Sequence, residues 1–172
     1  MAKWGYTWEA FDVETEDGFV LTTFHVTGTT ESGAFKPDKG AVLIQHGAQM
    51  DAARWIYDYG ENKPMPLILA DNGYDIWMGS ARGTEYSRGN TKGLTMDMQE
   101  FWAWSYAEMG VYDHPANIEF IKKQTGKEKI FYLGYSEGTV AMFYGLIKLG
   151  KTISDSLHKY VALAPCSIGS LG

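Results

Sequence analysis

Apolar and polar residues follow two different patterns along this chain of 172 residues. Between residues 9 and 26 they alternate, as in strands that bury one face, and a Glu16-Asp17-Gly18 turn separates residues 9–15 from residues 19–26. This pattern predicts an antiparallel β-hairpin within residues 1–28. Residues 27–40 are rich in Thr, Ser, Gly and Pro, which is typical of a loop.

From residue 41 onward, short apolar runs alternate with segments that suit helices. The runs at 41–44, 74–78, 129–133 and 159–164 predict strands, and the first of them is apolar throughout, as expected for a strand buried on both faces. Helices are expected at 66–72, 97–109, 113–125 and 139–149, with Asp113 as an N-cap and Gly126 as a stop. This alternation predicts an α/β fold whose mostly parallel sheet occupies residues 41–165 of one domain spanning residues 1–172.

Composition narrows the classes of protein. The chain is 45% hydrophobic and 15% aromatic, which suits a packed core, and its formal net charge of -6 without a basic cluster argues against nucleic-acid binding. Cys166 is the single cysteine, so no internal disulfide is expected, and it is interpreted as a small apolar filler. We expect neither a signal peptide at the N-terminus nor a transmembrane segment. No metal-ligand spacing or phosphate-binding loop is present, so no metal and no cofactor are expected.

The strongest chemical signal is Gly134-Tyr135-Ser136-Glu137-Gly138. A buried strand is predicted just before it and a helix just after it, which is the context of a nucleophile elbow. In such an elbow the serine sits on a sharp turn, and glycines on either side let the strand and the helix approach closely. The pattern therefore predicts Ser136 as a nucleophile at the carboxyl end of the sheet, with Gly134 and Gly138 supporting it.

A second signal, Gln45-His46-Gly47-Ala48, follows the first buried strand. In α/β-hydrolases the loop at this place and the residue after the nucleophile each donate a backbone N–H to an oxyanion hole. The two donors are predicted to be the amides of Ala48 and Glu137. His46 is interpreted mainly as a structural histidine that bonds nearby backbone, with catalysis as the alternative.

With both motifs in place, the chain resembles the acid lipases, the family of gastric and lysosomal lipases and sterol esterases, from about Trp4 to Pro165. Short matching stretches occur in order along the chain: residues 15–19, 45–47, 68–79, 82–83, 86–88, 100–102, 108–109, 112–113, 134–138 and 162–165. The resemblance implies an α/β-hydrolase fold, hydrolysis of a lipid ester and a core role for four aromatic residues: Phe101, Trp102, Trp104 and Tyr106.

The chain departs from the family pattern beside the nucleophile. Tyr135 stands where the family has His, and Glu137 stands where it has Gln. A carboxylate at Glu137 would oppose an oxyanion unless it pointed away, although the backbone donor is retained. Ala48 replaces a bulky apolar residue, which widens the predicted pocket near the oxyanion hole.

The resemblance also implies that the fold is incomplete here. The family's cap domain, last strands, triad Asp and triad His lie beyond the stretch that this chain matches, whereas a serine needs a base to become a nucleophile. His158 is expected at the opposite end of the sheet and His25 in the hairpin. His46 and His114 are the two histidines that can lie on the correct side.

Three interpretations therefore remain open. The chain is part of a lipase that works when complete, or a separate chain supplies the acid and the base, or the chain is an inactive hydrolase-like subunit for structure or interaction. In each case a sheet that stops after its sixth strand leaves an edge and an apolar face uncovered. We expect self-association or binding of a partner that completes the fold. The family is lysosomal or secreted, but no signal in this sequence indicates a compartment.

Overall fold

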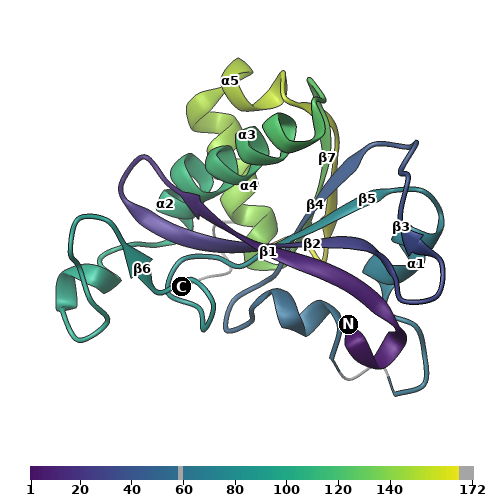
Figure 1. Cartoon of the computed structure of the whole chain (residues 1–172). Helices are drawn as coiled ribbons and strands as arrows, with labels where there is room; N and C mark the ends of the chain where they lie inside the picture. Colours follow the sequence, from purple (N-terminus) through teal and green to yellow (C-terminus); the bar gives the residue numbers. More distant parts are fainter. Residues whose placement is uncertain (58–59, 167–172) are drawn as a thin grey trace.

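A computed structural model describes residues 1–57 and 60–166 of the chain (Figure 1). Its sheet has the order β1-β2-β5-β4-β7-β8, and two very short strands, β3 and β6, pair with β2. The strands are β1 (Tyr6–Glu14), β2 (Phe19–Thr29), β3 (Gly33–Ala34), β4 (Ala41–Gln45), β5 (Asp75–Gly79), β6 (Gly89–Asn90), β7 (Ile130–Tyr135) and β8 (Leu157–Leu163). The helices are η1 (Ala2–Trp4), η2 (Ala52–Trp55), α1 (Met65–Asp71), η3 (Gln99–Trp102), α2 (Tyr106–Glu108), η4 (Met109–Asp113), α3 (His114–Thr125), α4 (Glu137–Leu149) and α5 (Lys151–Ser154).

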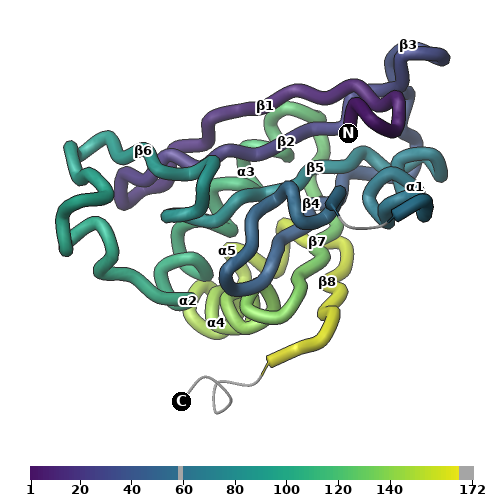
Figure 2. The backbone as a smooth tube through the Cα atoms, turned by 90° about the horizontal axis from the view of Figure 1, so that it is seen from below, coloured from purple at the N-terminus to yellow at the C-terminus, as the bar shows by residue number. Residues whose placement is uncertain are grey.

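The predicted α/β fold with an N-terminal antiparallel hairpin is confirmed. β1 pairs antiparallel with β2, and β2 pairs antiparallel with β5. β5, β4, β7 and β8 then run parallel to one another, so their carboxyl ends share one edge of the sheet. Figure 2, seen from below, shows β1 along one side of the molecule and β8 along the other.

Alternate residues of β4 explain why the whole strand is apolar. Val42 and Ile44 belong to the core cluster that includes Leu67 of α1, whereas Leu43 belongs to the cluster that includes Ile121 of α3. All five residues of β4 are buried. Helices therefore cover both faces of the sheet, with α3 to α5 on one side and α1 on the other.

The segment 97–109 is not the single helix that was expected. η3 ends at Trp102, and Ala103 has φ −78° and ψ 56°, which is not helical. Ser105 then starts a new helix with a capping box, because its side chain accepts the Ala107 N–H and Glu108 accepts the Ser105 N–H. α2, η4 and α3 follow one another without interruption.

Three other expectations need correction. Asp113 directly precedes α3 but does not cap it: it has helical φ and ψ of −66° and −49°, its side chain makes no capping hydrogen bond, and its carboxylate binds Arg82 instead. The stretch 27–40 is not wholly a loop, because β2 continues to Thr29 and β3 pairs with it. His158 lies inside β8 rather than before it, but still at the amino end of that strand.

The outer edge of the sheet and the helix beside it are poorly covered. Most residues of β8 are at least partly exposed, and Val161 is 37% exposed. On α4, Phe143 and Ile147 are 39% and 71% exposed, and the Phe143 ring packs against Tyr160 of β8. An apolar surface thus continues from α4 onto β8.

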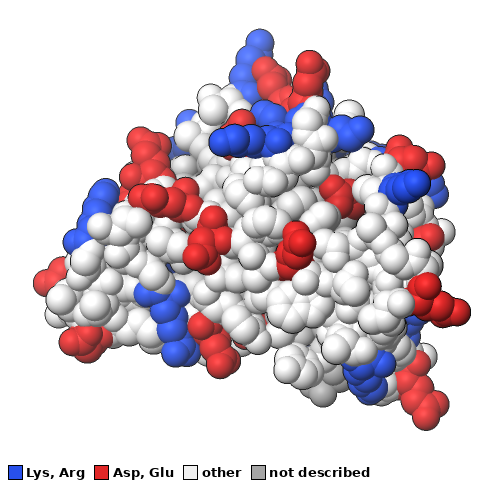
Figure 3. Space-filling view, viewed as in Figure 1, with Lys and Arg blue, Asp and Glu red and all other residues white. Residues whose placement is uncertain are grey.

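Charge on the face shown in Figure 3 is mixed. Basic and acidic side chains lie beside one another around its margin, and a broad area with few charged side chains lies between them. None of the helices in the described part of the chain has the length and apolarity that a membrane crossing requires.

Candidate active site

Ser136 occupies a strained turn between β7 and α4. Its φ is 50° and its ψ is −116°, a backbone conformation that residues with a side chain rarely adopt. The flanking glycines allow the close approach: a Cβ at Gly134 would lie 2.8 Å from the Gly138 carbonyl oxygen, and one at Gly138 would lie 2.7 Å from the His46 carbonyl oxygen. The local geometry is that of a nucleophile elbow.

Backbone hydrogen bonds hold this turn. The Ser136 N–H donates to the Leu163 carbonyl of β8 over 3.0 Å. The Ser136 carbonyl accepts from both the N–H and the hydroxyl of Thr139, at 2.8 and 2.5 Å. The Ser136 Oγ itself lies 3.6 Å from the Sγ of Cys166. The neighbouring strand β8 therefore fixes the backbone while the hydroxyl stays at the carboxyl edge.

The loop after β4 lies against the elbow. A Cβ at Gly47 would lie 2.9 Å from the Ser136 Cβ and 3.2 Å from the Tyr135 carbonyl oxygen, so only a glycine fits there. The Ala48 N–H has no hydrogen-bond partner among the described residues. Glu137 is the first residue of α4, so its N–H has no acceptor within the helix. Neither amide N–H has an acceptor among the described residues. Tyr135 packs its ring edge to face against Trp55, with ring centroids 6.1 Å apart.

A cavity of about 480 Å³ opens beside the elbow. It is lined by His46, Gly47, Ala48, Gln49, Met50, Asp51, Ala81, Arg82, Gly83, Thr84, Glu85, Trp102, Trp104, Met109 and Glu137. Glu137 lines this cavity, and burial raises the pKa of its carboxyl. Protonation of Glu137 as the pH falls removes a negative charge that opposes an oxyanion.

His46 is held as a neutral structural residue. Its Nδ1–H donates to the Gly47 carbonyl at 2.8 Å, and its Nε2 accepts the Ala81 N–H at 3.0 Å. Burial lowers its pKa, opposed by the Gly47 hydrogen bond and the charge of Asp51. With both nitrogens engaged, the ring has no free lone pair with which to deprotonate Ser136.

His114 is fully buried at the start of α3 and bonds Tyr132 over 3.0 Å through Nε2. The Tyr132 hydroxyl donates to the Gly138 carbonyl at 2.8 Å, so the His114 Nε2 carries the proton of the contact between them. Burial, with smaller contributions from His46 and Arg82, lowers the pKa of His114 to about 3. Among the described residues, no hydrogen bond joins Ser136 to a histidine.

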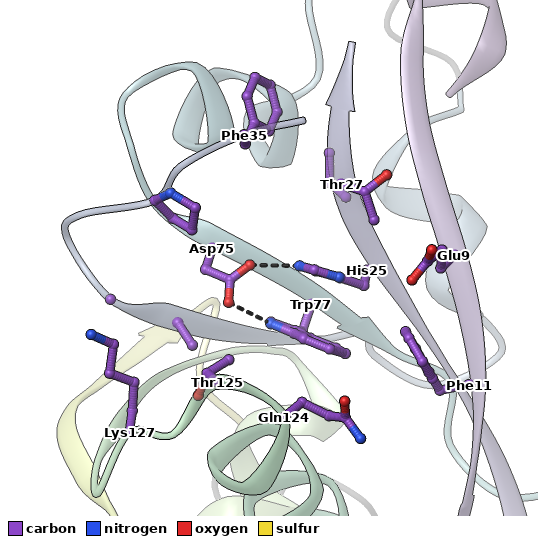
Figure 4. Close-up of a pocket in the computed structure, with 14 residues that line it drawn as sticks. Glu9, Phe11, His25, Thr27, Phe35, Asp75, Trp77, Gln124, Thr125 and Lys127 are labelled. Carbon is purple, nitrogen blue, oxygen red and sulfur yellow. Dashed lines mark hydrogen bonds and ion pairs between the residues drawn. The ribbon is translucent and has the colours of Figure 1, made fainter. Parts of the chain in front are cut away.

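His25 and His158 lie at the other end of the parallel strands. Figure 4 shows the Asp75 carboxylate bonded to the His25 ring on one side and to the Trp77 indole on the other, at 2.6 and 3.1 Å. The His25 and Trp77 rings stack 3.9 Å apart. The hollow around them, about 450 Å³, opens beside Asp75, the first residue of β5, far from the carboxyl edge that carries Ser136. His158 packs on Phe131 near the same end.

A buried ion pair that the sequence did not reveal supports the loop after β5. Arg82 donates from Nε and Nη2 to Asp113 at 2.8 and 2.6 Å, and from Nη1 to Asp17 at 2.6 Å. The Arg82 and Asp113 side chains are 1% and 2% exposed. Three segments that are far apart in sequence meet at this guanidinium, next to the cavity wall.

The sequence did not indicate where two residues near the site would lie. Cys166 follows β8, which lies parallel to β7, so both strands end at the same edge of the sheet and the thiol contacts Ser136 there. The order of the strands was the signal from which this contact could have been predicted. Trp102 is not core, since it is 44% exposed, whereas Phe101 is fully buried as expected. Trp104 and Tyr106 are partly buried and pack against core clusters, as expected. Trp102 and Trp104 both line the cavity. Within residues 1–57 and 60–166, no cluster of His, Cys, Asp or Glu could hold a metal ion.

Comparison with known families agrees with this geometry. A family model described as "alpha/beta hydrolase fold" matches residues 40–169, and one described as "Partial alpha/beta-hydrolase lipase region" matches residues 1–59. The chain belongs to the α/β-hydrolase family. Ser136 and Gly47 both lie within the residues that the first of these models matches.

Curated relatives confirm the resemblance to acid lipases. The chain is 38% identical to human lysosomal acid lipase/cholesteryl ester hydrolase over 96% of its own length and 41% of that protein. It is 38% identical to mouse gastric triacylglycerol lipase, over 94% of this chain and 40% of that protein. It is 41% identical to mouse lipase member M, over 94% of this chain and 37% of that protein. The chain thus spans about two fifths of the length of these relatives.

Solved structures show the same fold. An esterase of Pyrococcus furiosus superposes with a TM-score of 0.64 at 18% identity, over 95% of this chain and 53% of the esterase. Epoxide hydrolase A of Mycobacterium thermoresistibile gives a TM-score of 0.57 at 18% identity, over 91% and 39%. Two different chemistries on this fold mean that the fold alone does not fix the reaction.

Proposed function

We propose that this chain supplies the nucleophile and the oxyanion hole of a carboxylic ester hydrolase that acts on lipid esters. The observation that carries the proposal is the strained Ser136 turn with Gly47 packed directly against it. The names of the curated relatives, a cholesteryl ester hydrolase and a triacylglycerol lipase, support triacylglycerols or sterol esters as the substrate class.

The reaction follows from the positions of these groups. The Ser136 Oγ attacks the ester carbonyl carbon while a base takes its proton, and the carbonyl oxygen becomes an oxyanion. The amides of Ala48 and Glu137 donate to that oxyanion, and the N-terminus of α4 adds a favourable dipole. The tetrahedral intermediate expels the alcohol, which takes the proton from the base. Water then attacks the acyl-serine by the same steps and releases the carboxylic acid.

The base and its acid come, in this proposal, from polypeptide that adds beside β8. Three findings support it: neither candidate histidine near the site bonds Ser136, β8 is an edge strand, and the Leu163 carbonyl at its end bonds the Ser136 backbone. The added strands lie in a second stretch of chain or in a partner. The absence of a Ser136–histidine bond among the described residues favours one alternative, an inactive hydrolase-like subunit.

Labelling with a fluorophosphonate tests the role of Ser136. After long incubation with excess probe, we expect intact mass to show one adduct, and peptide mapping to place it on Ser136. The Ser136→Ala variant should carry none, whereas Cys166→Ser, which removes the neighbouring thiol, should still be labelled. An adduct that persists in Ser136→Ala would contradict the assignment.

The uncovered α4–β8 surface should make the isolated chain associate. We expect sedimentation to show dimers or larger species, and Ile147→Glu to shift the chain toward the monomer because it places a charge on a side chain that is 71% exposed on that surface. Ile68→Glu, on α1 and 46% exposed, is the matched control and should change little. A stable, monodisperse monomer of the unmodified chain would count against a completing partner.

A further inference from the structure

We infer that Trp102 and Trp104 form the wall on which the acyl chain of the substrate lies, in the cavity beside the oxyanion amides. This inference rests on the proposed function and names the part of the substrate that the cavity holds. The two indoles line the same cavity as Ala48 and Glu137. An ester whose carbonyl meets those amides places its acyl chain within reach of this wall.

The exposed part of the wall is hydrocarbon. The Trp102 indole N–H donates to the Met96 carbonyl at 2.8 Å, so the polar edge of this ring is already satisfied within the protein. The side chain is nevertheless 44% exposed, which is unusual for a tryptophan whose N–H needs no water. Met50 and the buried Met109 extend the apolar lining. Such a surface favours an aliphatic ligand over a polar one.

The wall is also rigid. The centroids of the two indole rings lie 6.1 Å apart, and Phe101 supports Trp102 from the core at 5.1 Å. Gly83, with φ of +75°, packs against both rings: a Cβ there would lie 2.6 Å from Trp104 Cζ2 and 3.0 Å from Trp102 Cζ3. Because the two indole rings contact both the Gly83 loop and the core, the surface is preformed. Binding a ligand there requires little further ordering of the protein, so the entropy cost is small.

The charges around the cavity select the same kind of ligand. Three acidic residues line the cavity: Asp51, Glu85 and Glu137. Two carboxylates compensate the positive charge of Arg82, and the His46 ring is neutral. An anionic headgroup is therefore disfavoured near the amides. An uncharged ester with a hydrocarbon chain therefore fits both the apolar wall and the acidic residues of the cavity.

A second apolar hollow provides the comparison. It lies between the N-terminal η1 and η2 and is lined by Trp4, Trp8 and Phe24 among others, and its volume is about 320 Å³. Neither Ala48 nor Glu137 lines it. Trp8 is 45% exposed, nearly the same as Trp102. Its fluorescence therefore reports ligand binding in this hollow from a residue with the same access to solvent.

Quenching of tryptophan fluorescence by a brominated ester tests the inference on the chain as it is. The probe is the methyl ester of a medium-chain fatty acid brominated at its end, kept below its critical micelle concentration, and a Ser136→Ala background prevents turnover. We expect saturable quenching. The Trp102→Phe/Trp104→Phe double variant should lose most of it, each single variant part of it, and Trp8→Phe almost none. The unbrominated ester should compete with the probe.

Three results would overturn the inference: no saturable quenching, quenching that survives in the double variant, or quenching that disappears in Trp8→Phe, which would place the chain in the N-terminal hollow. The single variants keep the test valid should the double variant fail to fold. Because Ser136 is absent from this assay, acyl binding can hold while fluorophosphonate labelling fails, and the reverse, so the two proposals fail separately.

Discussion

Replacing Arg82 with methionine should lower the free energy of unfolding by about 3–5 kcal/mol near neutral pH, the usual cost of removing one partner from a buried ion pair. The guanidinium makes hydrogen bonds to Asp113 and Asp17 and packs over the Phe19 ring at 4.2 Å. Methionine fills much of the space but leaves the Asp113 carboxyl, 2% exposed, without a cation. Urea unfolding measures the loss.

The loss should depend on pH. Burial raises the pKa of Asp113 from 3.8 to about 6 even though Arg82 opposes the shift, and removal of Arg82 raises it further. The pKa of such a carboxyl is higher in the folded protein than in the unfolded protein. Its contribution to stability is fully present below the unfolded-state pKa and is lost as the pH rises through the folded-state pKa. The Arg82→Met penalty should therefore be full at about pH 8 and smaller at about pH 5.

The control for this variant is Arg88→Met, because Arg88 is exposed and only six positions away. It should change the free energy of unfolding by no more than about 0.5 kcal/mol. A loss of less than about 1 kcal/mol in Arg82→Met, or an equal loss at both pH values, would show that the ion pair does not support the loop beside the cavity.

An Ala48→Pro variant should slow the reaction of Ser136 with a fluorophosphonate by about 10²–10³-fold, the usual effect of removing one oxyanion donor. Proline has no N–H, so the amide that is free in this structure disappears. The measurement is the pseudo-first-order rate of adduct formation, followed by intact mass under conditions in which the parent reacts.

Ala48→Gly separates the amide from the side chain. It keeps the N–H and should react at nearly the parent rate. Proline also restricts the preceding Gly47, so circular dichroism and urea unfolding must show that Ala48→Pro stays folded. Equal rates in the proline and glycine variants would remove Ala48 from the oxyanion hole.

The sequence was sufficient to predict the sheet and the elbow, because both depend on local patterns. The apolar run of β4 is buried on both faces, and its residues alternate between two core clusters. The glycines at 134 and 138 fit a turn in which backbone meets backbone. The roles of Ser136, Ala48 and Glu137 remain predictions, with the geometry in their favour.

Features that depend on contacts between residues distant in sequence could not be predicted. Asp113 had the local features of an N-cap, yet the Ser105–Glu108 capping box starts the helix earlier and Arg82 takes the carboxylate. The resemblance to acid lipases implied a core role for Trp102, but Trp102 is 44% exposed whereas its neighbour Phe101 is fully buried. Nothing in a local pattern indicates which residue the distant Arg82 will bind.

The central claim is that this chain holds the nucleophile and the oxyanion amides but not the base, and added imidazole tests it directly. We measure the rate of fluorophosphonate labelling at Ser136 against imidazole concentration, with Ser136→Ala as the blank. The account predicts slow labelling without imidazole and an increase with imidazole that the blank lacks, since a general base contributes about 10²–10⁴-fold. Fast labelling of the chain alone, independent of imidazole, would contradict it and show that a base lies within these 172 residues.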